Sequence, residues 1–135
     1  MLPSIRVVAA IIINTENQFL MARKKEGKPL AGYWEFPGGK VDGGEADITA
    51  LKREIREELN VELKDIKFSF AYTYRYPDKE IDFVFFRAQI DIGKIRLTDH
   101  DDVVWIDMSE IYNYKIAPAD REALQHISKT EKPKD

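Results

Sequence analysis

The first hydrophobic run of the chain is apolar at almost every position. Residues Ile5–Ile13 (IRVVAAIII) are rich in β-branched side chains. A strand that is apolar on both faces is typical of the covered centre of a sheet, so we predict a central strand here. The polar residues 14–17 predict a turn, and Gln18–Ala22 then predicts the returning strand.

Further along, the period of the pattern changes from that of a strand to that of a helix and back. Apolar side chains at helical spacing predict a helix with one stripe facing a core: Ile48, Leu51, Ile55 and Leu59. Ile66–Tyr76 and Ile81–Ile90 flank a turn and predict a hairpin. The remaining predicted elements are a short strand at Val103–Ile106, one helical turn at Ser109–Tyr112 and a second helix from Pro118 to about Ser128. This order predicts an α/β domain in which helices pack on a mixed sheet.

Composition narrows the class of protein. The 135 residues suit a single domain, which we place at residues 1–128, followed by a polar tail at 129–135. The net charge is −3 with both signs interspersed, so we expect no polymeric nucleic acid as a partner. The absence of cysteine excludes disulfides and thiolate metal sites. The apolar run Val7–Ile13 is too short to span a bilayer, so we expect no membrane partner and a cytoplasmic location.

The strongest chemical signal is the stretch Gly38–Val61, GGKVDGGEADITALKREIREELNV. It opens with two glycines, which allow the backbone to approach a ligand closely. Glu54, Glu57 and Glu58 follow at i, i+3 and i+4, which places three carboxylates on one flank of the predicted helix. Two ionised carboxylates about 6 Å apart repel by about 3 kcal/mol at an effective dielectric of about 20. A solvated acidic helix face is the alternative interpretation, but the glycine-rich lead-in favours a functional site.

The spacing of this stretch resembles the Nudix box. The matching positions are Gly39, Glu45 after five residues, Arg53–Glu58 (REIREE) after seven, and Asn60-Val61 after one more. Asn60 departs from the Gly usual in the family, at a position that ends the helix in a left-handed conformation, which Asn tolerates. The chain from Ile5 through Pro118 is similar to the MutT branch, which shares WEFPGGK at 34–40, YPD at 76–78 and APAD at 117–120. The resemblance implies a single-domain α/β/α sandwich with the mixed sheet between helices.

The resemblance also implies a divalent metal site. Oxygen ligands without cysteine suit Mg²⁺ or Mn²⁺. The matching positions would supply the ligands: the side chains of Glu54, Glu57 and Glu58 and the carbonyl of Gly38. Arg53 would orient a box carboxylate, and Glu45 would brace the loop against the helix.

Two carboxylates compete for the role of general base, which differs among branches of the family. We favour Glu54, acting on a water held at the metal. Asp99 is the alternative because it lies six residues before Trp105, where MutT-like sequences carry a late acidic residue. It is shorter than the glutamate usual there, and a solvated loop charge is its other interpretation. We expect His100 beside it to be a surface residue.

The reaction implied by the resemblance is hydrolysis of a (deoxy)nucleoside triphosphate, including modified ones, to monophosphate and pyrophosphate. Catalysis would rest on positioning and electrostatics, with water as the nucleophile. One alternative is hydrolysis of ADP-ribose or a dinucleoside diphosphate. The other is a non-enzymatic module that senses a nucleotide, although such modules tend to lose box carboxylates that this chain keeps.

Candidates for substrate contacts lie mainly outside the acidic helix. Arg23 and Lys24 lead a polar loop whose cations could meet phosphates, and Lys40 could reach one as well. Tyr76 could stack on a nucleobase rather than pack in the sheet. Asp120 lies where MutT-like enzymes read the base, and it resembles a branch that acts on cytosine nucleotides, whereas the guanine-specific branch has Asn. The alternative for Asp120 is a carboxylate that favours the helix dipole. We expect a monomer or a homodimer with a small nucleotide as its substrate.

Overall fold

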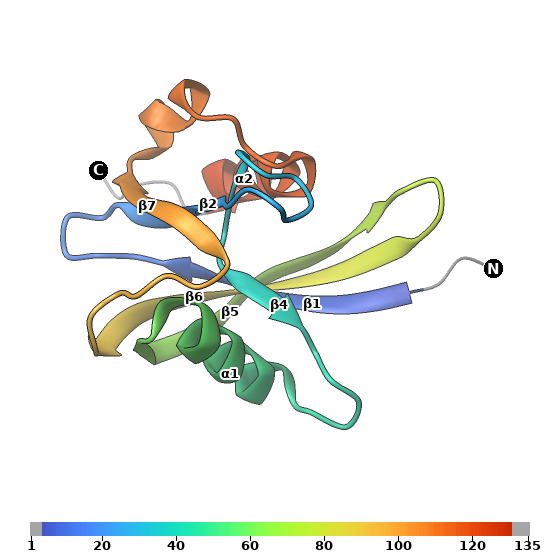
Figure 1. Cartoon of the computed structure of the whole chain (residues 1–135), viewed down its shortest axis with the longest axis horizontal. Helices are drawn as coiled ribbons and strands as arrows, with labels where there is room; N and C mark the ends of the chain where they lie inside the picture. The colour runs from blue at the N-terminus through green and yellow to red at the C-terminus, as the bar shows by residue number, and fades with distance from the viewer. Residues whose placement is uncertain (1–3, 131–135) are drawn as a thin grey trace.

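Two β-sheets lie between two helices in the computed structural model, which describes residues 4–130, with side chains through Ile127 (Figure 1). The first sheet has the order β4 (Gly38–Lys40), β1 (Ser4–Ile12), β6 (Glu80–Ile92) and β5 (Glu62–Arg75). The second has the order β3 (Trp34–Glu35), β2 (Phe19–Lys24) and β7 (His100–Ile106). The helices are α1 (Asp47–Leu59), α2 (Pro118–Thr130) and the 3₁₀ helix η1 (Met108–Asn113). Among the described residues, no helix is both long and apolar enough to cross a membrane.

Strand β1 is the centre of the arrangement, as its apolar sequence predicted. It pairs parallel with β6 and antiparallel with β4, which makes the first sheet mixed. Successive side chains of β1 point to opposite faces. Val8, Ala10 and Ile12 pack in one buried cluster with α1, whereas Ala9 and Ile11 pack in a second cluster with α2. The predicted α/β fold with a mixed sheet between helices is therefore confirmed.

Helix α1 is held to the sheet by its apolar stripe and by an ion pair between its first residue, Asp47, and Arg6 of β1 at 2.6 Å. Leu51, Ile55 and Leu59 are fully buried, but Ile48 is 42% exposed, so its predicted place in the stripe was wrong. The helix ends at Asn60, which adopts a left-handed φ of 61° and donates its N–H to the Arg56 carbonyl. The prediction that Asn60 ends the helix in a left-handed conformation is confirmed.

The hairpin β5–β6 and helix α2 complete the second cluster. Both hairpin strands are longer than predicted, and β5 carries register shifts against β6. Tyr72 of β5 stacks parallel to Phe85, and its hydroxyl donates to the Ala119 carbonyl, which connects the sheet to α2. Helix α2 starts at Pro118, as predicted, and continues to Thr130. The rest of the predicted polar tail, residues 131–135, lies outside the described residues.

Candidate active site

The backbone at Gly38 and Gly39 lies too close to its neighbours to carry side chains. A Cβ on Gly38 would lie 2.1 Å from the Val8 carbonyl oxygen, because β4 pairs with β1 at this point. A Cβ on Gly39 would lie 2.3 Å from the carboxyl carbon of Glu54. Glycine at 38 therefore lets β4 pair closely with β1, and glycine at 39 lets the Glu54 side chain reach from α1 to the backbone of β4.

Glu58 is the buried carboxylate of α1. It is 7% exposed, and the Gly38 N–H donates to its Oε2 at 3.1 Å. Burial, followed by the charge of Glu35 and with smaller effects from Glu54 and Asp99, raises the pKa of Glu58 to about 8. Carboxylates are thus crowded together at the point where α1 meets β4.

Arg53 joins the box carboxylates to each other and to the loop before α1. Its guanidinium donates to both carboxylate oxygens of Glu45, at 2.8 and 3.0 Å, and to Glu54 Oε1 at 2.8 Å. It also donates to Glu57 Oε2 at 3.4 Å and to the Lys40 carbonyl at 3.1 Å. Burial nevertheless raises the pKa of Glu54, against the lowering effect of Arg53. Glu57 is the outermost of the three, with a side chain 58% exposed.

The chemistry of this donor set fits a divalent cation. Three carboxylates without sulfur suit Mg²⁺ or Mn²⁺. Within residues 4–130, no group of three or more His, Cys, Asp or Glu side chains is arranged as a ready metal site. Mg²⁺ does not need a complete cage, because it keeps several waters and binds substrate phosphates. A cation beside Glu58 would also offset the crowding that raises its pKa.

Arg23 and Lys24 are the last two residues of β2, so their predicted place in the following loop was wrong. Both have acidic partners, in the ion pairs Arg23–Asp101 at 2.6 Å and Lys24–Glu35 at 3.8 Å. In the loop after β2, Lys28 pairs with Asp99 at 3.3 Å. The Asp99 side chain is 42% exposed, but its charge contributes to the raised pKa of Glu58. Asp99 therefore lies near the box without joining its buried part. Lys40 is exposed on β4.

A second buried carboxylate lies at the start of α2. Asp120 is 7% exposed and accepts a hydrogen bond from the Phe36 N–H at 3.3 Å. Burial, followed by the charge of Glu35, raises the pKa of Asp120 well above its usual range. Tyr76 is half-buried, and its pKa is raised by burial, by a neighbouring tyrosine and by the charge of Asp120. Because Phe36 precedes Gly38 by two residues, Asp120 binds the same short segment of backbone as Glu58, and Tyr76 lies near enough to Asp120 to feel its charge.

The interior position of His100 was not predicted. The expectation of a surface residue was wrong, because His100 is 3% exposed. Strand β7 begins at His100, three residues before the predicted strand, and this turns the imidazole inward. Its Nε2 lies 2.9 Å from Oε2 of Glu35. The polar run at residues 98–102 hides the start of the strand, and nothing in the pattern pairs His100 with Glu35.

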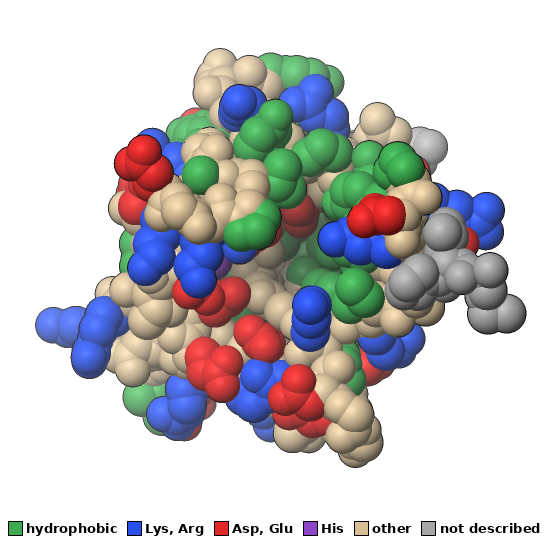
Figure 2. All heavy atoms as spheres, turned by 45° about the vertical axis from the view of Figure 1, so that its right-hand side comes forward, with side chains coloured by type: hydrophobic (Ala, Val, Ile, Leu, Met, Phe, Trp, Pro, Cys, Tyr) green, Lys and Arg blue, Asp and Glu red, His purple; other side chains and the backbone are tan. Residues whose placement is uncertain are grey.

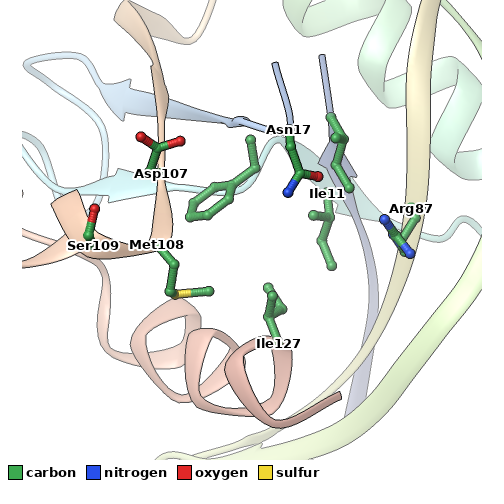
Figure 3. Close-up of a pocket in the computed structure, with 9 residues that line it drawn as sticks. Ile11, Asn17, Arg87, Asp107, Met108, Ser109 and Ile127 are labelled. Carbon is green, nitrogen blue, oxygen red and sulfur yellow. The ribbon is translucent and has the colours of Figure 1, made fainter. Parts of the chain in front are cut away.

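The surface around the box combines acidic and apolar character. In Figure 2, acidic and basic side chains gather in the lower part of the view, on the side of α1, and hydrophobic side chains surround a hollow above them. A cavity of about 380 Å³ lies elsewhere, between β1, η1 and α2 (Figure 3). Ile11, Met108 and Ile127 face it, and its lining shares no residue with the candidates above. The candidate active site is the box, where Glu58 is buried beside Glu54 and Glu57, and not this cavity.

The chain is similar to known proteins over most of its length. The family model described as NUDIX domain matches residues 3–127. The chain is 31% identical to an 8-oxo-dGTP diphosphatase of Haemophilus influenzae over 91% of this chain and 90% of the relative. It is 33% identical to a CTP pyrophosphohydrolase of Escherichia coli over 90% of this chain and 89% of the relative.

Solved structures show the same fold. The solution structure of the E. coli ORF135 protein superposes with a TM-score of 0.82 at 30% identity, over 99% of this chain and 96% of that one. The crystal structure of a MutT protein from Methanosarcina mazei Go1 superposes with a TM-score of 0.83 at 24% identity, over 98% of both chains. The second likeness concerns the fold alone.

Proposed function

This chain belongs to the Nudix family and is a pyrophosphohydrolase, and we propose that it hydrolyses (deoxy)nucleoside triphosphates to monophosphates and pyrophosphate. The named activities of the two curated relatives support this substrate class. The observation that carries the proposal is the contact of Glu54 and Glu58 with the backbone of Gly39 and Gly38. This contact brings together carboxylates that could bind a metal ion beside the substrate phosphates. Asp120, which accepts the Phe36 N–H, would contact the base.

We propose Mg²⁺, with Mn²⁺ as a substitute, as the cofactor. Its ligands would be the side chains of Glu54, Glu57 and Glu58 and the carbonyl of Gly38. When bound, the ion supplies positive charge to the phosphates and lowers the pKa of a bound water. The Arg53 guanidinium donates hydrogen bonds to Glu54, to Glu57 and to the Lys40 carbonyl, and so orients both carboxylates toward β4.

Glu54 is our proposed general base. Its pKa is raised by burial, which makes it a better proton acceptor than a solvated glutamate. Water would attack phosphorus and pass a proton to Glu54, while the α–β anhydride bond breaks and pyrophosphate leaves with the bonding electron pair. Asp99 remains the alternative base, but its ion pair with Lys28 and its exposure favour Glu54.

We propose the remaining contacts with the substrate from the positions of the side chains. Lys40 is exposed on β4 and would meet a phosphate directly. Arg23 and Lys24 would contact phosphates by exchanging their carboxylate partners for the substrate. Tyr76 would stack on the base that Asp120 reads.

The base read by Asp120 depends on its protonation. An ionised carboxylate only accepts hydrogen bonds and suits the exocyclic amine of cytosine or adenine. Burial raises the pKa of Asp120, so a protonated form that also donates competes with the ionised one. We propose that the ionised form favours cytosine-type triphosphates, and that the protonated form admits guanine types.

A nucleotide panel with identified products tests the proposal. The wild-type protein and a Glu57→Gln control would be incubated with Mg²⁺ and dCTP, dATP, dGTP, their oxidised forms, ADP-ribose and a dinucleoside diphosphate. Pyrophosphate release from the triphosphates, lost in the control, is the expected result. Turnover confined to ADP-ribose or the dinucleotide, with two monophosphate products, would reject the substrate class. The cytoplasmic location and the monomeric or dimeric state stay predictions.

A further inference from the structure

One buried polar side chain has no role in the proposed reaction. His100 opens β7, its side chain is fully buried, and its Nε2 lies 2.9 Å from Oε2 of Glu35 on β3. The two residues are 65 positions apart in sequence, so the contact joins β3 to β7 across β2. Lys24 of β2 also approaches Glu35, but only to 3.8 Å.

The hydrogen bond to Glu35 places a hydrogen on Nε2 of the imidazole. An ionised carboxylate only accepts, so Nε2 carries the hydrogen and donates it. His100 Nδ1 is then buried without a hydrogen-bond partner in the described part of the chain. A buried polar atom left unpaired is unfavourable, and an apolar residue of similar size would avoid it. Stability alone therefore does not explain a histidine at this position.

Glu35 lies between the two ends of the candidate active site. The next residue, Phe36, donates its N–H to Asp120. Gly38, three residues after Glu35, donates its N–H to Glu58 at 3.1 Å, so the segment that begins at Glu35 contacts both buried carboxylates. In agreement with this, the charge of Glu35 contributes to the raised pKa of both Glu58 and Asp120. Its side chain is 23% exposed, which leaves it accessible to a substrate as well as anchored by His100.

We propose that His100 is a positioning residue that fixes the Glu35 carboxylate between Glu58 and Asp120 and thereby sets the selection among nucleobases. This inference rests on the proposed function. Without the imidazole, Glu35 is free to turn toward Lys24 or solvent, and an acceptor-only group is lost from the base end of the site. The effect falls on nucleotide binding and ranking more than on the chemical step.

Matched variants separate positioning from packing. His100→Met fills the space without a donor, His100→Gln keeps a donor near Nε2, and Val104→Ala removes apolar contacts on the same strand. We expect His100→Met to raise KM for dCTP about fivefold or more, equivalent to about 1 kcal/mol, with kcat within about twofold. The dCTP to dGTP ratio of kcat/KM should change at least threefold, whereas His100→Gln and Val104→Ala should keep the wild-type ratio.

A double variant tests whether His100 acts through Glu35. Once Glu35→Ala has removed the carboxylate, adding His100→Met should leave the nucleotide ratio unchanged. Effects that multiply, or an unchanged ratio in His100→Met alone, would overturn the proposal. The ¹⁵N spectrum of the imidazole supplies a readout without substrate. An Nε2–H tautomer that is perturbed in Glu35→Ala supports the contact, and an Nδ1–H tautomer overturns it. Wild-type protein that hydrolyses none of the triphosphates rejects the proposed function instead.

Discussion

Glu58→Gln should stabilise the metal-free protein while it reduces turnover. Glutamine has nearly the same shape as glutamate, and its carbonyl oxygen can still accept the Gly38 N–H that Glu58 accepts at 3.1 Å. The substitution removes a charge from a site that is 7% exposed and close to Glu35, Glu54 and Asp99. Repulsion and desolvation of the wild-type carboxylate lower the free energy of unfolding. The variant should regain this amount because its amide carries no charge.

The size of the gain follows from the pKa of Glu58, which rises from an ordinary 4.5 to about 8. A folded-state pKa above the unfolded one means that the folded protein binds the extra proton. Stability is therefore lost as the pH rises through this interval, by about 5 kcal/mol if the whole shift is realised. Partial relaxation of neighbouring carboxylates lowers this, so we expect about 2–5 kcal/mol at pH 8 and no difference below about pH 4.5.

Thermal unfolding in EDTA between pH 4 and pH 8.5 measures this difference. A gain of this size corresponds to a melting temperature higher by roughly 10 °C in Glu58→Gln at the alkaline end. Glu57→Gln is the matched control, because its carboxylate is 58% exposed and should show no comparable pH-dependent gain. Adding Mg²⁺ should stabilise the wild type more than Glu58→Gln, since the proposed ligand is lost.

Two results would refute this reasoning. A variant less stable than the wild type at pH 8 would mean that Glu58 is held by favourable partners rather than crowded by charges. A stability difference independent of pH would mean that the Glu58 carboxyl does not titrate between 4.5 and 8 in the folded protein.

Three further predictions concern the site. Glu57→Gln should lose more than about tenfold in kcat with Mg²⁺, or about 1.4 kcal/mol; a smaller loss in pyrophosphate release would count against its metal role. Gly39→Ala should lower kcat about tenfold, because its Cβ would displace the Glu54 carboxyl. Gly38→Ala should mainly lower the melting temperature, because its Cβ would meet backbone. A kcat loss in Gly38→Ala together with a stability loss in Gly39→Ala would contradict the geometry. Asp120→Asn should shift kcat/KM from dCTP toward dGTP about fivefold or more. The wild-type preference for dCTP should rise with pH as Asp120 ionises, and an unchanged ranking in both proteins leaves the helix-dipole interpretation.

Long periodic elements could be predicted from the sequence, and very short ones could not. The apolar run of β1 and the helical spacing of α1 each extend over enough residues to define a period. Strands β3 and β4 have two and three residues, and they exist because neighbouring strands offer them partners. Tertiary pairing of this kind leaves no periodic signal.

In the candidate site, too, the local spacing could be predicted and the tertiary contacts could not. The spacing of Glu54, Glu57 and Glu58 could be predicted to place them on one flank of α1, but not which of them is buried. That difference arises because β4 covers Glu58 and leaves Glu57 in solvent. The contact between His100 and Glu35 depends on the register of three strands, which no local pattern encodes.

The alternation of β1 has a consequence for local unfolding. Its odd and even positions belong to different hydrophobic clusters, so displacing this strand would disrupt both clusters at once. Amide protons of β1 should therefore exchange with solvent only through global unfolding, and those of the loop at 25–33 through small local openings. The strand next to the Gly38–Gly39 backbone is thus the part of the chain that opens last, and the geometry needed for turnover would persist through most native fluctuations.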